Sequence, residues 1–192
     1  MSAAAPLRAD TGGAPELFEL IRTRSFRRGK FTLASGRESE LYFNLKPTMM
    51  WPAGALLCAR AFLDQIHAEG VDYVGGLEMG AVPIIGALAA VGEAEGRPAK
   101  TFFVRKAKKD YGAEQQVEGL AAGESLQGKT VMVLDDVATT GGSILKAADA
   151  ARAAGAVVQT ALVVVDREEG AAEFLAEHGM RLLSVFKGPQ FL

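Results

Sequence analysis

Apolar strand-like runs that alternate with helix-like segments place the tightest limit on how this chain can fold. Runs such as "TVMVLDD" (130–136) and "AVVQTALVVVD" (156–166) are apolar over most of their length. Both faces of such strands are expected to be buried, and their alternation with helices is typical of a parallel sheet covered on both faces. We therefore expect an α/β fold, with strands at residues 71–76, 101–104, 130–136, 156–166 and 181–186 and helices at 81–96, 143–155 and 170–179.

Smaller elements are expected before this alternation begins. Apolar residues at helical spacing in "APELFELIRTRS" (14–25) predict a short amphipathic helix. The segments "KFTL" (30–33) and "LYFNLK" (41–46) are predicted to be short strands on either side of a turn. A longer helix is expected over residues 52–69, because a proline opens this segment and Gly70 follows it.

The length of 192 residues suits one domain with a sizeable core, and the sequence contains no internal repeat or low-complexity linker. We predict a single domain over residues 1–192. Residues 1–14 lack the apolar core of a signal peptide and are expected to be a mobile tail. The segment 105–128 is too long and too polar for an ordinary connection, which predicts a lid or binding loop.

Composition excludes several classes of protein. Hydrophobic residues make up 49% of the chain and charged residues 23%, which argues against a disordered chain. The net charge of −2 provides no overall attraction for nucleic acid, and no apolar stretch reaches the roughly 20 residues of a membrane helix. The single cysteine, Cys58, cannot form an intrachain disulfide and is expected to be a buried small hydrophobe. We therefore expect a cytoplasmic protein that binds neither nucleic acid nor membranes.

The stretch "VMVLDDVATTGGS" (131–143) joins an apolar strand to two carboxylates and a turn of small residues. Ligands of parallel α/β sheets bind at the carboxyl ends of the strands, where Asp135 and Asp136 are expected. The turn offers backbone N–H groups, hydroxyl donors and the positive end of the next helix, which together suit a phosphate. The two acids would repel a phosphate, but they can accept hydrogen bonds from hydroxyls or meet a hydrated cation. A ribose 5-phosphate would satisfy both halves of this site.

Other site patterns are missing from the sequence. No Gly-Lys-Ser/Thr follows these glycines, which excludes a Walker loop, and no G-x-G-x-x-G follows the first strand of the alternating series, which disfavours a nicotinamide enzyme. No cluster of cysteines and histidines supports a structural metal, and His67 and His178 are expected to face solvent. Of two basic clusters, the one at 22–30 is expected to be a solvated face, whereas the one at 105–110 opens the long polar segment.

Four separated segments resemble one known family. The stretch 131–143 resembles the phosphoribosyl-diphosphate (PRPP) signature of type I phosphoribosyltransferases. "FFVRKAKKDYG" (102–112) is similar to the mobile catalytic loop of the orotate phosphoribosyltransferase family. "FTLASGRESELYFNLK" (31–46) is similar to that family's N-terminal substrate segment, and "VVVDREEG" (163–170) to its orotate-side segment. The segments stand in family order over most of the chain.

The resemblance implies a five-stranded parallel core with a small N-terminal hood, and a homodimer in which each mobile loop covers the neighbouring site. It implies transfer of the phosphoribosyl group from PRPP to orotate, with Mg²⁺ carried by the diphosphate and reached by Asp135 and Asp136 through water. The implied catalytic residues are Arg105, Lys106, Lys109, Asp135 and Asp136. The implied PRPP-binding residues are Arg105, Lys106, Lys109, Tyr111, Asp135, Asp136, Val137, Ala138, Thr139, Thr140, Gly141, Gly142 and Ser143. The implied orotate-binding residues are Phe43, Asn44, Lys46, Thr139 and Arg167, with core packing as the alternative role of Phe43.

The chain departs from the family pattern at three places. Ala34 replaces a lysine of the N-terminal segment, Met79 or Gly80 replaces a second lysine, and Tyr111 stands where the loop often has histidine. We expect Lys46 to compensate in holding the diphosphate. Two alternatives remain open: a type I phosphoribosyltransferase acting on a purine or uracil, and a PRPP-sensing regulator without catalysis. The cationic loop favours an enzyme, because a sensor does not need to stabilise a leaving diphosphate.

Overall fold

A six-stranded sheet lies at the centre of the computed structural model, which describes residues 14–32, 38–106 and 116–192. In this described part of the chain five neighbouring strands are parallel, and the two-residue edge strand β5 pairs antiparallel with β4. The predicted five-stranded parallel core is therefore confirmed, with β5 added at its edge. The spatial order is β5 (Val117–Glu118), β4 (Thr101–Val104), β3 (Tyr73–Leu77), β6 (Thr130–Ala138), β7 (Val157–Asp166) and β8 (Arg181–Lys187).

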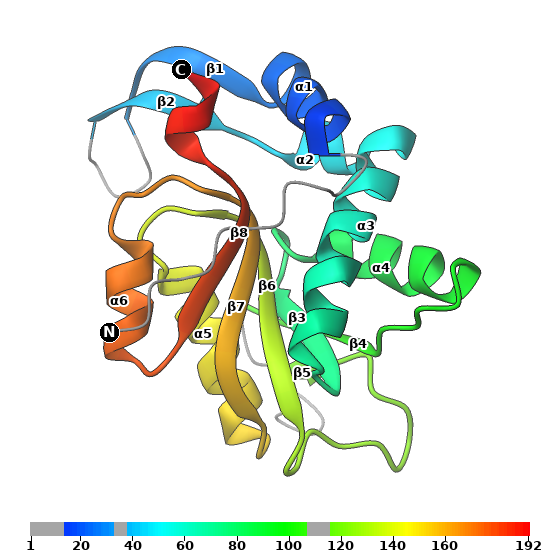
Figure 1. Ribbon diagram of the computed structural model, residues 1–192. Coiled ribbons are helices and arrows are strands. Elements are labelled where there is room, and N and C mark those ends of the chain that lie inside the picture. The colour runs from blue at the N-terminus through cyan, green and yellow to red at the C-terminus, as the bar shows by residue number, and fades with distance from the viewer. Residues whose placement is uncertain (1–13, 33–37, 107–115) are drawn as a thin grey trace.

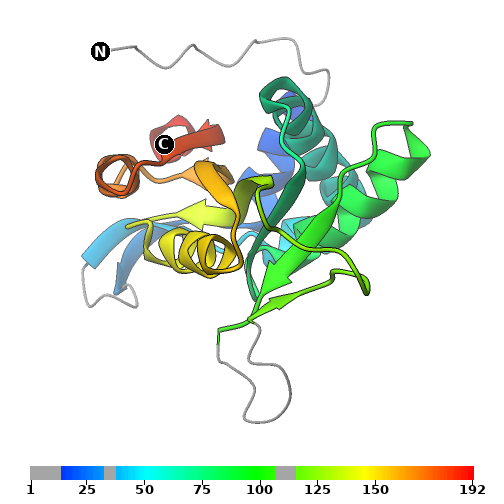
Figure 2. The same cartoon turned by 90° about the horizontal axis from the view of Figure 1, so that it is seen from below.

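Helices cover both faces of this sheet, as strands that are apolar on both sides require (Figures 1 and 2). Met132 and Leu134 of β6 belong to the hydrophobic core that α3 and α4 complete. Val131 and Val133 of the same strand belong to the core that α5 and α6 complete. The four covering helices are α3 (Pro52–Glu69), α4 (Val82–Ala94), α5 (Gly142–Ala153) and α6 (Ala171–Glu177).

A smaller layer, here called the hood, lies over the carboxyl ends of the strands (Figure 1). It consists of α1 (Ala14–Arg24), the antiparallel strands β1 (Phe26–Thr32) and β2 (Glu38–Phe43), α2 (Lys46–Met49) and the 3-10 helix η1 (Gly188–Phe191). Aromatic rings hold these elements together: Phe191 stacks on Phe18 at 4.4 Å and meets the edge of Phe43 at 5.2 Å between ring centroids. Phe43 is only 9% exposed. The structure therefore supports core packing as the role of this ring.

Element boundaries differ from the expectations in several places, among them the strand expected from Lys30, which begins at Phe26 as β1. The strand β6 continues through Val137 and Ala138, which pair with β7. The predicted strand over residues 41–46 ends at Phe43, because the chain then enters the short helix α2, which was not predicted. Part of the expected loop 105–128 forms β5, and Leu126 within it is 1% exposed, so the latter part of this segment packs against the domain.

Other expectations are met within the described residues. The helix predicted over 52–69 has these bounds as α3. Cys58 is 1% exposed, and burial raises the pKa of its thiol to about 12, as expected of a buried small hydrophobe. His67 and His178 are exposed. None of the helices that the structure describes is long and apolar enough to cross a membrane. The assignment of residues 1–192 to a single domain stays a prediction, and residues 1–13 of the expected tail lie outside the described ranges.

Candidate active site

The site is built around the end of β6 and the turn that leads into α5. Gly141 has φ +83° and precedes the first residue of the helix, Gly142. This left-handed conformation suits glycine, and a Cβ there would also approach Phe174 to 3.0 Å. The turn thereby directs the N-terminus of α5 toward the carboxyl edge of the sheet, where backbone N–H groups can bind an anion. Ala138, expected in the turn, belongs to the strand together with Val137, while Thr139 and Thr140 form the turn itself.

Asp135 is a buried acid at this edge, with 5% of its surface exposed. Its Oδ2 accepts a hydrogen bond from Ser143 Oγ at 2.7 Å, and its Oδ1 accepts one from the Asp136 backbone N–H at 2.9 Å. Burial, and then the charge of Asp136, raise the pKa of Asp135 to about 7. Asp135 therefore exchanges its proton near neutral pH. The sequence indicated Ser143 as a phosphate ligand, but not its hydrogen bond to Asp135.

Asp136 is oriented by the backbone and faces a lysine of the hood. Its Oδ1 accepts a hydrogen bond from the Val137 N–H at 2.9 Å. Its Oδ2 lies 3.6 Å from Lys46 Nζ, and the two side chains are 15% and 49% exposed. Lys46, which the sequence assigned to orotate or diphosphate, is therefore brought into the site beside an acid from β6. Asn44 lies next to it, and its Oδ1 accepts the Lys46 N–H at 3.3 Å.

The turn between β3 and α4 approaches the same carboxylates. A Cβ placed on Gly80 would lie 2.3 Å from Asp135 Oδ1 and 3.1 Å from Asp136 Oδ1, so a side chain at this position would displace the acids. The neighbouring Met79 is 58% exposed, and the Glu78–Met79 peptide is cis. Of the two positions considered for the missing lysine, only Met79 has room for a side chain.

Two of the expected loop cations lie at the end of β4, the strand next to β3. Arg105 Nη1 is 3.6 Å from Glu118 Oε1, and the Lys106 N–H donates to Glu78 Oε1 at 2.8 Å. Both line a cavity of about 410 Å³ together with Lys146 of α5. Arg105 N–H also donates to the Gln116 carbonyl at 2.9 Å, which ties together the two ends of the described chain around residues 107–115. Lys109 and Tyr111 lie outside the described residues, as does Ala34 of the N-terminal segment.

Arg167 follows β7 directly and joins the core to the hood. Its side chain is 4% exposed, and Nη2 donates to the Leu41 carbonyl of β2 at 2.9 Å and to Glu169 Oε1 at 2.6 Å. Its backbone N–H donates to the Ala138 carbonyl at 3.0 Å. The expected orotate residue therefore lies between the end of β6 and the hood. No pattern in the sequence predicted Glu169 or the Leu41 carbonyl as its partners.

Comparisons with known proteins agree with this geometry. Residues 50–178 match the family described as phosphoribosyl transferase domain. The chain is 53% identical over 176 residues to the orotate phosphoribosyltransferase of Rhodopseudomonas palustris, and the alignment covers 92% of this chain and 94% of that protein. The crystal structure of Mycobacterium tuberculosis orotate phosphoribosyltransferase in complex with Fe(III) dicitrate is similar with a TM-score of 0.79 and 34% identity, covering 93% of this chain and 98% of that one. Its complex with PRPP is similar with a TM-score of 0.75, at the same identity and coverage.

The resemblance of the four segments is thereby confirmed. The matches extend over nearly the whole chain, and the fold has the parallel core and the hood that the resemblance implied. This protein belongs to the orotate phosphoribosyltransferase family.

Proposed function

We propose that this protein transfers the 5-phosphoribosyl group of PRPP to orotate, releasing diphosphate and forming orotidine 5′-monophosphate for pyrimidine biosynthesis. The observation that carries the proposal is the pair Asp135 and Asp136 beside the glycine turn, in a chain that belongs to this family. We place the protein in the cytoplasm, where its single buried thiol would stay reduced.

The turn after β6 would hold the 5-phosphate of PRPP. Backbone N–H groups of Gly141, Gly142 and Ser143, at the start of α5, and the hydroxyls of Thr139 and Thr140 are suitable donors. The ribose hydroxyls of the same ligand would then donate to Asp135 and Asp136, since both carboxylates lie at the adjacent strand end.

The acid pair also fits the metal that the family implies. Within the described residues no group of three or more histidine, cysteine, aspartate or glutamate side chains could hold a metal ion alone. Two adjacent carboxylates are, however, suitable water-mediated neighbours for an Mg²⁺ that PRPP itself ligates. When bound, Mg²⁺ would neutralise part of the charge on the diphosphate.

The charges that develop during the reaction suggest roles for the remaining residues. Cleavage of the bond between C1′ and the diphosphate leaves positive charge on the ribose and negative charge on the leaving group. Fixed cations lower such a barrier by being in place before the charge develops. We assign this role to Arg105, Lys106 and Lys109, with Tyr111 as a further diphosphate contact. The carboxylates of Asp135 and Asp136 would offset the charge on the ribose.

Orotate would lie between the turn and the hood. Arg167 would bind its carboxylate, with Thr139 from the turn and Asn44 and Lys46 from the hood around the ring. Phe43 would support this wall from the core. We expect Arg167→Ala to raise the KM for orotate about tenfold or more, because a charge-assisted contact is lost, and to change the KM for PRPP less. Arg22→Ala, at an exposed arginine of α1, is the matched control. An unchanged KM for orotate would assign the carboxylate to another residue.

A panel of bases tests the substrate assignment. Diphosphate release is measured with PRPP and Mg²⁺ in the presence of orotate, uracil, adenine or hypoxanthine. We expect release only with orotate, and none after Mg²⁺ is chelated. Turnover with adenine but not orotate would overturn the base assignment, whereas binding of PRPP without turnover of any base would indicate a regulator.

We also propose a homodimer with a shared site. Exposed apolar side chains near the site support a partner surface: Met50, Trp51 and Met79 are 74%, 47% and 58% exposed. In a two-fold dimer, loops exchanged across the interface would serve two equivalent sites.

Subunit complementation tests this arrangement. Lys109→Ala and Asp136→Ala proteins, each nearly inactive, are mixed and allowed to exchange subunits. Random exchange between equal amounts of the two proteins makes about half of the dimers mixed. If each site takes Lys109 from one chain and Asp136 from the other, every mixed dimer holds one intact site and one doubly damaged site. Activity should then recover to roughly a quarter of the wild-type value. Demonstrated exchange without recovery would mean that each loop serves its own subunit.

A further inference from the structure

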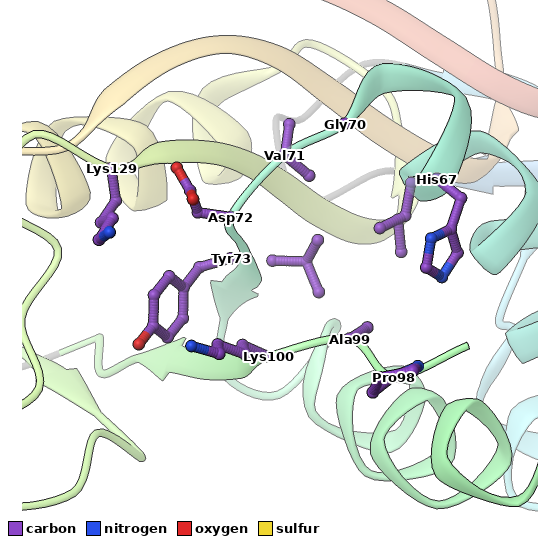
Figure 3. A pocket seen from close by; sticks show the side chains of 11 residues that line it. His67, Gly70, Val71, Asp72, Tyr73, Pro98, Ala99, Lys100 and Lys129 are labelled. Carbon is purple, nitrogen blue, oxygen red and sulfur yellow. The ribbon is translucent and has the colours of Figure 1, made fainter. Parts of the chain in front are cut away.

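A separate cavity opens at the amino edge of the sheet, where β3, β4 and β6 begin (Figure 3). It has a volume of about 260 Å³ and lies between the end of α3 and the segments that lead into these strands. Because the strands are parallel, this edge is at the opposite end from Asp135 and the glycine turn. The cavity is therefore distinct from the active site.

The side chains that line this cavity carry two positive charges, from lysines, and one negative charge. Lys100 and Lys129 line it with one acid, Asp72. The Asp72 carboxylate already accepts hydrogen bonds from the Thr130 N–H at 2.8 Å and from Thr130 Oγ1 at 2.7 Å. Because Thr130 already donates to the Asp72 carboxylate, and Glu124 outside the cavity accepts the Tyr73 hydroxyl, the two lysines are the lining groups that can bind a ligand with a negative charge.

The rest of the lining is apolar or aromatic and is held in place. Val71, Val74 and Ala99 contribute to the apolar wall, and Tyr73 has its ring 5.4 Å from Lys100 Nζ. In Figure 3 Tyr73, Lys100 and Lys129 lie on one side and His67 on the other.

Hydrogen bonds outside the cavity orient two of these side chains, Tyr73 and His67. The Tyr73 hydroxyl donates to Glu124 Oε1 at 3.4 Å, and His67 Nε2 lies 3.2 Å from the Arg97 carbonyl oxygen. A wall fixed in this way loses little conformational entropy when a ligand binds.

We propose that this cavity binds a small planar monoanion, an aromatic or heteroaromatic monocarboxylate. Its carboxylate would lie between Lys100 and Lys129, and its ring would cover Val71 and Val74 beside Tyr73. The volume is below the roughly 300–1,000 Å³ typical of drug-sized ligands, which favours a compound with one ring.

Benzoate is the probe, with benzamide as a neutral compound of the same shape and acetate as a carboxylate without a ring. Binding is measured by titration calorimetry and ligand-observed NMR on the full-length Arg167→Ala protein, so that the orotate site does not contribute. We expect benzoate to bind at least about tenfold more tightly than benzamide, because the charge-assisted contacts need the carboxylate. Equal affinity for benzamide, equal affinity for acetate, or no binding of benzoate would each overturn the proposal.

Charge-removing variants locate the site. In the same background, Lys100→Met and Lys129→Met keep the aliphatic stem, and together they should weaken benzoate binding about tenfold. Lys146→Met is the matched control, because Lys146 lines the other cavity beside Arg105. Thermal melts verify that each variant is folded. Loss of binding in Lys146→Met with retention in the double variant would overturn the assignment to the amino edge.

Discussion

Two aspartates at opposite edges of the same sheet accept similar hydrogen bonds, but their pKa values are shifted in opposite directions. Asp135 accepts hydrogen bonds from Ser143 Oγ at 2.7 Å and from the Asp136 N–H at 2.9 Å. Asp72 accepts them from Thr130 Oγ1 at 2.7 Å and from the Thr130 N–H at 2.8 Å. The pKa of Asp135 is nevertheless raised to about 7, whereas the pKa of Asp72 is lowered.

Burial and the sign of the neighbouring charge account for the difference. Asp135 is removed from water and lies beside a second carboxylate, both of which disfavour its ionised form. Asp72 is exposed, so the hydrogen bonds from Thr130 dominate, and the charges of Lys129 and Lys100 lower its pKa further. An acid that serves only stability is best placed like Asp72. The placement of Asp135 costs stability, which is common where residues are arranged for binding or catalysis.

The largest expected effect is on catalysis at the carboxyl edge. We expect Asp136→Asn to lower kcat about 100-fold, because a carboxylate that offsets charge on the ribose becomes neutral. Asp72→Asn at the amino edge is the matched control and should leave kcat unchanged. Steady-state kinetics with saturating PRPP and orotate measure both. Equal losses in the two variants would mean that the acids of the two edges do not differ in role.

A smaller effect is expected from the glycine that touches the acid pair. Gly80→Ala should lower kcat/KM for PRPP roughly tenfold, because its Cβ would lie 2.3 Å from Asp135 Oδ1 and push the carboxylates out of position. Gly86→Ala is the control, since no atom lies within 4 Å of a Cβ at that position of α4. That variant should keep its activity and gain slightly in stability, as alanine favours the helix. Normal kinetics for Gly80→Ala would show that the acids tolerate displacement.

The sequence predicted the parts of the site that are local in the chain. The strand, Asp135, Asp136 and the glycine turn follow one another, and their order alone predicted a phosphate and hydroxyl site. Contacts between residues that are far apart in the sequence were harder to predict. The Lys46 pair with Asp136 and the Arg167 hydrogen bond to the Leu41 carbonyl join residues that are far apart in sequence, so periodicity and turn chemistry carry no information about them.

Phe43 illustrates a further limit of sequence-based prediction. An aromatic residue in a hood strand is compatible both with stacking on a substrate and with core packing. Its burial against Phe26 and Phe191 is decided by η1, a short helix at the far end of the chain that was not predicted.

The raised pKa of Asp135 predicts how the stability of the protein changes with pH. The pKa of Asp135 lies near 7 in the folded protein and at an ordinary 3.8 in the unfolded chain, so folding favours the protonated form. The stabilisation is complete below about pH 4 and is lost as the pH rises through 7. We therefore expect Asp135→Asn, a neutral side chain of similar shape, to raise the Tm by about 3 °C or more at pH 8. The difference should vanish near pH 4. A lower Tm at pH 8 would show that the ionised carboxylate is stabilised by its surroundings.

The smallest expected effect is a change in Tm caused by removing the charge of Asp72 at the amino edge. Its sign is opposite to that expected for Asp135→Asn. The lowered pKa of Asp72 means that folding favours its ionised form, so its contribution is present above the unfolded pKa of 3.8 and is lost as the pH falls through the folded value. Asp72→Asn should lower the Tm by about 1–2 °C at pH 7, because the group is exposed and solvent screens its partners. The difference should disappear in acid.

Thr130→Val separates the two causes of this effect. It removes the hydroxyl that donates to Asp72 Oδ2 and keeps the Thr130 N–H donor, Lys129 and Lys100 in place. If the hydrogen bond is the larger cause, Thr130→Val reproduces most of the loss, and high salt changes it little, because salt screens the lysine charges and leaves the hydrogen bond intact. The opposite result would be that high salt abolishes the Tm difference between the wild-type protein and Asp72→Asn, while Thr130→Val leaves the Tm unchanged. That result would assign the stabilisation of Asp72 to the lysines. The two edges would then differ in the burial of the acid and in the sign of the charge beside it, and not in the hydrogen bonds that each acid accepts.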